Sequence, residues 1–339
     1  MHGLNLSSCL RRFLYNGLSS STRATYRGAQ VSYENFCARE GFPTWPAKRI
    51  PIAEWLAYRA MGSLDEPAVR PNVLRQYLSH LRSVHVDRCY SVRVFDENAL
   101  FLRVLEGVSR LLPPVDKRKS EALTVERLHK LLSPPDVELV TFPQIDELNF
   151  RAACLVAFAA FLRPGEFTYT AKSLDNRYVF EQTKLLRSDI TFAQNDEYCI
   201  LHLKRSKTDY QHVGVDIIIA GTGDSFCPVQ ALRLLFKGDK GLPNAPLFRF
   251  STGAFTINRV LSMLRTKLSE RHFTNARDFT GKCWRRGAAQ TAENRGMSEH
   301  DRKKLGRWSS DAFKLYFDED KKSLFGLNSR LLTGLAPPL

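Results

Sequence analysis

The sequence lacks paired cysteines and long hydrophobic runs. Its seven cysteines are an odd number, widely spaced, and none of them forms a Cys-x-x-Cys pair. This pattern gives neither a disulfide framework nor a zinc site, and it fits a reducing compartment. No apolar run is long enough to cross a bilayer, and the apolar run near the N-terminus is too broken for a secretory signal. We therefore expect no membrane span and no structural zinc.

Acidic residues are also scarce relative to basic ones. The 339 residues include 50 Lys and Arg but only 35 Asp and Glu, which leaves a formal net charge of +15. Such an excess favours a polyanionic partner, either a nucleic acid or an anionic membrane surface. Because the basic residues occur throughout both halves of the chain and no segment could enter a bilayer, we predict a nucleic acid.

The first third of the chain has the pattern of a helical module. Residues 1–18 are expected to be a flexible N-terminus, and the Ser/Thr cluster that follows is typical of a helix cap. Apolar residues then recur at helical spacing, which predicts an all-α domain over residues 19–113. The predicted helices run from the Ser/Thr cluster to Gly41 and over residues 52–61, 70–86 and 100–112. Dispersed arginines such as Arg23 are most often a solvated face.

A change of pattern follows the prolines Pro113 and Pro114. Residues 114–121 are predicted to be a linker, residues 122–320 a second domain and residues 321–339 a C-terminal tail. The second domain mixes helical periodicity with β-rich runs, so we predict an α+β domain with a small antiparallel sheet. Its β-rich runs are residues 189–192, 197–205 and 213–220, and its helices include residues 149–162, 227–236 and 255–268.

Four segments of this second domain carry groups suited to phosphate chemistry. The first is FLRPGEF, in which Glu166 follows Arg163 by three residues and can orient its guanidinium. The second is the polar turn around Lys207. The third and fourth are GKCWRRGAA at residues 281–289 and LGRWSSDAF at residues 305–313, followed by Tyr316. From pattern alone, each also fits an ordinary structural role, such as a helix-terminal salt bridge, a solvated turn or a packed helical bundle.

The last two segments resemble the C-terminal box of the tyrosine recombinase (phage integrase) family. That box runs G-H-S-F-R-R-G-A-A, then L-G-R-W-S-S-D-A-Y, then the nucleophilic tyrosine. The sequence of these two segments is most similar to that of the recombinases of eukaryotic mobile elements, the Crypton and DIRS/Ngaro-like groups. One departure is Lys282, where the family usually has His. FLRPGEF resembles the family's G-L-R-x-x-E box with Phe161 in place of Gly, and the Lys207 turn resembles its S/T-K-T-G turn with Asp209 in place of Gly.

The resemblance implies a set of catalytic residues. It makes Tyr316 the nucleophile, Arg163 and Arg285 the groups that hold the phosphate oxygens, and Lys207 the proton donor. Lys282 would contact the phosphate as a cation, and Trp308 would occupy the family's His or Trp position. Supporting roles fall to Glu166 and Arg286. Candidate DNA contacts are Lys204, Arg205 and, in the helical domain, Arg23, Arg27, Arg75 and Arg82.

The resemblance also implies a fold and a reaction. The N-terminal module would be a core-binding (SAM-like) domain that clamps double-stranded DNA, and the second domain would exchange strands through a 3′-phosphotyrosyl intermediate without a metal or cofactor. We expect a homo-tetramer or dimer on DNA, in the nucleus if the source is eukaryotic and otherwise in the cytoplasm. Two alternatives stay open: type IB topoisomerase-like relaxation, which Lys282 favours, and a catalytically inactive DNA-binding derivative. The target sequence does not follow from the chain.

Overall fold

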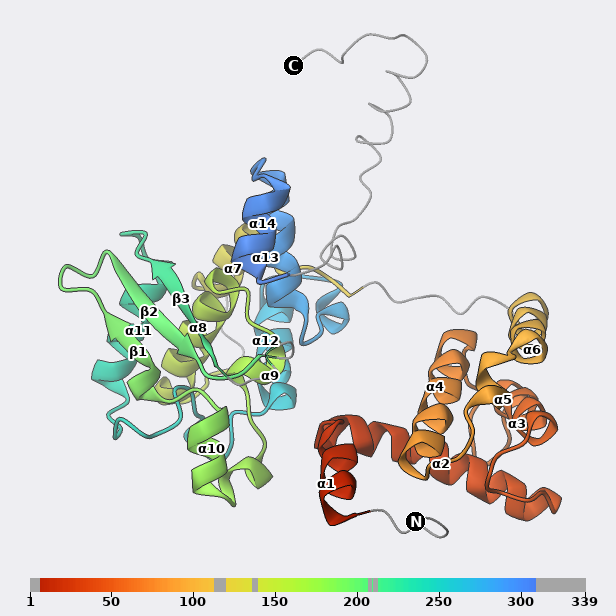
Figure 1. The fold of residues 1–339 in the computed structure, drawn as a ribbon. Helices are drawn as coiled ribbons and strands as arrows, with labels where there is room; N and C mark the ends of the chain where they lie inside the picture. The colour runs from red at the N-terminus through yellow and green to blue at the C-terminus, as the bar shows by residue number, and fades with distance from the viewer. Residues whose placement is uncertain (1–6, 113–119, 136–139, 207–208, 210–212, 309–339) are drawn as a thin grey trace, which may run out of the picture. The chain divides into compact units, whose positions relative to one another are not determined.

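The structure is a computed structural model that describes residues 7–112, 120–135, 140–206, 209 and 213–308. The chain divides into two compact units, Met1–Lys117 and Arg118–Leu339, each with its own hydrophobic core (Figure 1). Within the described residues no helix is both long and apolar enough to span a membrane.

The regular elements in the described residues of unit 1 are all helices. Its core gathers large side chains from several helices, among them Tyr33, Trp55 and Phe101. Ser19 begins the longest helix, because its Oγ accepts a hydrogen bond from Thr22 N at 3.2 Å. Gly41 ends that helix with φ 72°, in the left-handed region that glycine adopts readily. The helices are α1 Ser8–Asn16, α2 Ser20–Glu40, α3 Arg49–Met61, α4 Pro71–Asp87, α5 Arg93–Asp96 and α6 Ala99–Leu111.

The N-terminal segment differs from the expectation that residues 1–18 are flexible. Residues 8–16 form α1, and Ser7 Oγ caps it by accepting from Leu10 N at 3.2 Å. Arg23 of α2 then holds the end of α1, since its guanidinium donates to Tyr15 O and lies over the Tyr15 ring at 4.5 Å. These contacts come from the next helix, so the pattern of residues 1–18 alone did not reveal them.

A buried histidine joins three segments of unit 1. His85 lies in α4 and is 1% exposed. Its Nε2 accepts from Ala47 N at 3.0 Å, so the proton is on Nδ1, which donates to Ser91 O at 2.8 Å. Burial lowers the pKa of this imidazole, and the nearby charge of Arg88 lowers it further. The neutral ring is therefore part of the folded structure.

Unit 2 combines helices with one small sheet. The helices are α7 Val125–Leu132, α8 Gln144–Ala159, α9 Pro164–Phe167, α10 Arg177–Thr183, α11 Pro228–Gly238, α12 Ile257–Glu270, α13 Cys283–Asn294 and α14 Glu299–Gly306. Short 3-10 turns are η1 Ala171–Leu174, η2 Arg187–Asp189 and η3 Ala276–Asp278. The strands are β1 Ile190–Phe192, β2 Tyr198–Leu203 and β3 Val215–Ala220. This is the predicted fold class, an all-α domain followed by an α+β domain with a small antiparallel sheet.

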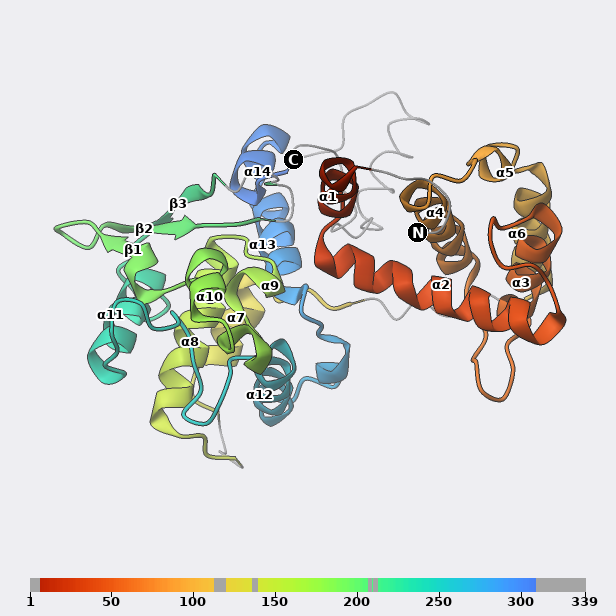
Figure 2. The same ribbon diagram turned by 60° about the horizontal axis from the view of Figure 1, so that its bottom comes forward.

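The sheet is antiparallel in the order β1-β2-β3, with Ile190 opposite Leu201 and Leu203 opposite Val215. Alternate residues of β2 are buried and exposed, as expected for a sheet with one covered face. Helix α11 packs against the covered face of the sheet (Figure 2). There Phe236 meets Phe192 edge-on. Strand β2 ends at Leu203, two residues before the predicted end, because Lys204 turns toward Asp189.

The centre of unit 2 is α8, which packs against α11 and α13. The small residues that begin at Gly287 let α13 approach its neighbour closely, as the sequence predicts. A Cβ at Gly287 would lie 1.8 Å from the carbonyl oxygen of Leu123. The segment before α7 is hydrogen-bonded to the start of α13 and to η3, with Leu123 N donating to Cys283 O at 3.0 Å and Glu121 N to Asp278 O at 3.0 Å. Glu121, predicted to belong to the linker, is therefore bonded to unit 2.

Candidate functional site

Arg163 lies where α8 turns into α9. Phe161, two residues earlier, has φ 49°, a left-handed conformation that favours glycine, and it occupies the position where the recombinase box has Gly. Arg163 then acts as the N-cap residue of α9. Its backbone N donates to Glu166 Oε2 at 2.8 Å and its Nη1 to Glu166 Oε1 at 2.9 Å. The side chain of Glu166 is only 6% exposed, so the carboxylate fixes this guanidinium.

Arg285 enters the same region from α13. Its guanidinium donates to the carbonyl oxygens of Phe161 and Gly306, which lie at the ends of α8 and α14. The Trp308 ring lies over it, with 4.6 Å between the guanidinium carbon and the ring centroid. Arg285 is 2% exposed. Arg285, the second predicted phosphate-binding arginine, is therefore buried and links α13 to the ends of α8 and α14.

Trp308 packs back onto the end of α14. Its ring meets Phe161 edge-on, with the ring centroids 5.9 Å apart, in addition to covering Arg285. A Cβ at Gly306 would lie 1.9 Å from Trp308 Cζ3, so only glycine leaves room for the ring. Glycine is the residue that most often takes the left-handed position at the end of a helix. Instead Gly306 is the last helical residue, and Arg307 is left-handed with φ 53°.

Arg307 was missed as a site residue by the sequence analysis. Its Nη1 donates to Ala160 O at 2.7 Å and its Nη2 to Glu166 Oε2 at 3.1 Å. Burial lowers the pKa of its guanidinium, while the charge of Glu166 opposes that shift and the charge of Arg163 adds to it. The only signal in the sequence is a cation between Gly306 and Trp308, and the resemblance assigned a role to Trp308 in this segment.

Lys282 is exposed at the N-terminus of α13, and Arg286 follows on the first turn. A Cβ at Gly281 would lie 3.0 Å from Pro164 Cγ. This close approach places the start of α13 against the Arg163 turn, and Figure 1 shows α13 and α14 side by side. The structure thus brings together Arg163, Glu166, Arg285, Arg307 and Trp308, and it adds the Lys282 segment at their edge.

Two predicted catalytic residues, Lys207 and Tyr316, lie outside the described residues. Near the first, Lys204 Nζ is 2.8 Å from Asp189 Oδ2 and donates to Glu181 O at 2.8 Å, so it is tied to its own domain. Arg205 is exposed. The roles of these residues in binding or cleaving DNA stay predictions.

The candidate DNA-contacting arginines of unit 1 fall into two groups. Arg23 pairs with Asp87 at 2.8 Å and Arg82 with Asp96 at 3.1 Å. Arg27 and Arg75 are exposed. Arg23, with 20% of its side chain exposed, has a clear structural role. Arg82 is 49% exposed although it is paired, so Arg27, Arg75 and Arg82 are all better placed than Arg23 to meet a polyanion.

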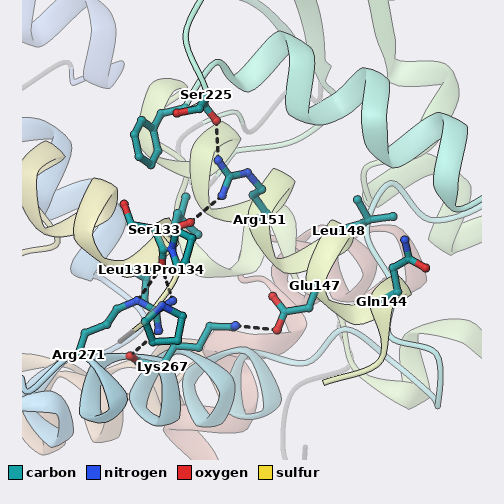
Figure 3. Close-up of a pocket in the computed structure, with 13 residues that line it drawn as sticks. Leu131, Ser133, Pro134, Gln144, Glu147, Leu148, Arg151, Ser225, Lys267 and Arg271 are labelled. Carbon is teal, nitrogen blue, oxygen red and sulfur yellow. Dashed lines mark hydrogen bonds and ion pairs between the residues drawn. The ribbon is translucent and has the colours of Figure 1, made fainter. Parts of the chain in front are cut away.

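A separate cavity of about 530 Å³ lies at the N-terminal end of α8 (Figure 3). Three cations line it, but each is already engaged. Arg151 Nη1 donates to Leu132 O at 2.8 Å, Arg271 Nε donates to Ser133 O at 3.1 Å, and Lys267 pairs with Glu147 at 2.6 Å. The arginines hold the carbonyl groups at the end of α7, so this cluster stabilises the fold. Among the residues with described placement, no group of three His, Cys, Asp or Glu could hold a metal ion.

No protein-family model matches the sequence, and a search of curated proteins finds no match. Solved structures do match. The Tn1549 transposon integrase in complex with a circular intermediate DNA is 15% identical, with a TM-score of 0.57 over 95% of this chain and 97% of that chain. The XerH site-specific recombinase bound to difH substrate is 14% identical, with a TM-score of 0.51 over 87% and 75%. At this identity the likeness is one of fold, and the chain has the fold of the tyrosine recombinases.

Proposed function

We propose that the protein is a DNA breaking and rejoining enzyme that carries out site-specific strand exchange. The observation that carries the proposal is the meeting of Arg163 and Glu166, at the start of α9, with Arg285 of α13, and with Lys282 at the edge. Guanidinium groups suit the geometry of a phosphate, and an electropositive corner can stabilise the charge that builds on its oxygens. The matching structures contain DNA, which fits the excess of basic residues in this chain.

The reaction begins with attack of the Tyr316 oxygen on a backbone phosphorus. The phenol proton leaves, the bond to the 5′ oxygen breaks, and Lys207 gives that oxygen a proton. The product is a 3′-phosphotyrosyl bond, which a second 5′-hydroxyl attacks in the reverse sense. A free phenol titrates near pH ~10, so neighbouring cations must favour the phenolate. Arg163 supplies one such charge, and Lys282 acts as a further phosphate contact, since lysine is a poor base near neutral pH.

The subgroup of recombinases to which we assign the enzyme follows from the sequences of residues 281–289 and 305–313. These sequences place the enzyme with the Crypton and DIRS/Ngaro-like recombinases of mobile elements, acting in integration and excision in the nucleus. Four strands are exchanged in such a reaction, so the working form is a homo-tetramer on double-stranded DNA, with Arg27 and Arg75 among the clamp contacts. No cofactor enters the reaction as written.

The experiment is covalent capture on DNA whose sequence is not assumed. The full-length protein is incubated with nicked suicide duplexes that carry a randomised centre, and products resistant to detergent are recovered and sequenced. Tyr316→Phe should abolish capture, because phenylalanine has no nucleophile. Tyr178→Phe is the matched control, since Tyr178 is 75% exposed in unit 2 and should capture DNA like the wild type. Equal capture by the Tyr316 variant would refute the proposal.

One observation favours a second candidate, a recombinase-derived protein that binds DNA without cutting it. Arg285 is buried and spends donors on two backbone carbonyl groups instead of facing an open surface. For this candidate the same incubation gives retarded duplex but no covalent product. A topoisomerase-like enzyme, which Lys282 favours, would instead relax supercoiled plasmid that has no specific site.

A further inference from the structure

Glu166 is shared by two arginines that are far apart in the sequence. Its Oε1 accepts from Arg163 Nη1 at 2.9 Å, and its Oε2 accepts from Arg307 Nη2 at 3.1 Å. Arg307 lies 141 positions further along the chain. The carboxylate is thus held from both sides in a site where its side chain is 6% exposed. Its orientation, and with it that of Arg163, depends on both guanidinium groups.

Arg307 is well fixed for such a role. Its Nη1 donates to Ala160 O at 2.7 Å, and its backbone N donates to Lys304 O at 3.2 Å. The guanidinium therefore spans from the end of α14 to the end of α8. Its side chain is only 15% exposed, and burying a charge is costly unless it is paired. Here the pairing partner is the carboxylate that orients the first predicted catalytic arginine.

The charges at this corner explain what Arg307 contributes. Arg163 with Glu166 alone is a neutral pair, and a neutral pair attracts a phosphate weakly. Arg307 offsets the carboxylate, so the positive charge of Arg163 is no longer cancelled. Within the described part of the chain, Arg163 Nε and Nη2 have no hydrogen-bond partner, and 23% of its side chain is exposed. These donors can face a ligand.

We propose that Arg307 is a positioning residue for Arg163. It fixes Glu166 and offsets its charge, so that Arg163 presents free donors and a net positive charge to a DNA phosphate. The inference rests on the proposed function and deepens it. The two neighbouring residues then have different roles. Trp308 covers Arg285, whereas Arg307 orients Arg163 through Glu166.

The test uses the full chain and a duplex recovered from the randomised pool, at saturating DNA and in a single turnover. Arg307→Gln should slow covalent capture about 100-fold, the loss typical for one preorganised electrostatic group. The dissociation constant for the duplex should stay within about threefold, because one charge of many contributes little to overall binding. Arg307→Lys keeps the charge but loses the fork, and its rate should lie between those of the wild type and Arg307→Gln.

The matched control is Arg302→Gln. Arg302 lies in α14, the helix that Arg307 follows as its C-cap residue. Its side chain is also 15% exposed, and it pairs with a different carboxylate, Glu293, at 2.9 Å. It should capture DNA within about threefold of the wild type, because its partner Glu293 is not the carboxylate that orients Arg163. If Arg302→Gln loses as much as Arg307→Gln, the effect is one of helix stability and the inference is wrong.

A double-mutant cycle tests the route through Glu166. Glu166→Gln removes the charge that Arg307 offsets, so adding Arg307→Gln should then cost less than about threefold. Fully additive losses would overturn the inference. If Arg307→Gln does not fold, the rate of covalent capture by Arg307→Lys tests the inference instead. A wild-type rate for that variant would mean that Arg307 only stabilises the fold. Wild-type protein that captures no duplex overturns the proposed function itself, whereas normal capture by Arg307→Gln overturns only the role of Arg307.

Discussion

Gly287→Ala should destabilise unit 2, although alanine is the better helix former. The new Cβ would lie 1.8 Å from Leu123 O and 2.2 Å from Leu123 C, and both are backbone atoms that cannot rotate away. Ordinary contact begins at 3.4 Å, so the segment before α7 must move by roughly 1.6 Å. That shift disturbs the hydrogen bonds that Glu121 N, Leu123 N and Val125 N make to residues 278–291.

The magnitude follows from two opposing effects. Each of the three hydrogen bonds contributes about 1 kcal/mol, so their loss costs about 3 kcal/mol. The higher helix propensity of alanine returns about 1 kcal/mol. The net loss in the free energy of unfolding is therefore about 2 kcal/mol, within the range measured for overpacked sites.

Hydrogen exchange measured by mass spectrometry resolves the two units in one experiment. Peptides from α8 report on unit 2 and should exchange faster in Gly287→Ala, whereas peptides from α3 report on unit 1 and should be unchanged. Gly28→Ala is the control variant. Gly28 lies inside α2 with nothing within 4 Å of the new Cβ, so that variant should protect unit 1 slightly better. Unit 2 protection equal to or above wild type in Gly287→Ala would refute the packing argument.

Two further predictions concern titratable groups. Because burial lowers the pKa of His85, the unfolded chain binds more protons near pH 6, and unit 1 should lose stability as pH falls from about 7.5 to 5.5. Protection factors of α4 peptides, calculated against the intrinsic exchange rate at each pH, that are equal or higher at the lower pH would contradict this. Burial raises the pKa of Cys154 to about 12 and that of Cys283 well above its usual value. N-ethylmaleimide at pH 8 should therefore modify the exposed Cys9 and Cys89 in the native protein and spare these two, and rapid labelling of either buried thiol would sink the prediction.

Elements defined by local signals could be predicted well. The start of α2 after Ser19, its end at Gly41 and the cap of α14 at Ser298 each depend on residues within four positions. The alternation in β2 predicts a half-buried strand for the same reason. By contrast, the C-terminal end of α1 is held by Arg23 of the next helix, which donates to Leu14 O. Contacts that a helix receives from other segments cannot be predicted from the sequence of that helix alone.

The candidate site divides in the same way. The pairing of Arg163 with Glu166 follows from a spacing of three residues at a Pro-Gly turn, so the sequence predicts it. The burial of Arg285 does not follow, because its acceptors, Phe161 O and Gly306 O, come from two other helices. Trp308 was assigned because it would occupy the His or Trp position of the family pattern. Packing gave Arg307 the place beside Glu166.

By itself, the sequence determined the basic character, the fold class and the short-range pairs, since these depend on composition, periodicity and neighbours within a turn. Only the tertiary structure decided which cations share a carboxylate and which are buried. The reason is that those contacts join residues more than a hundred positions apart, as Phe161 with Arg285 and Glu166 with Arg307 do. Their geometry is set by how α8, α13 and α14 pack, and a close approach such as Gly287 on Leu123 fixes that packing.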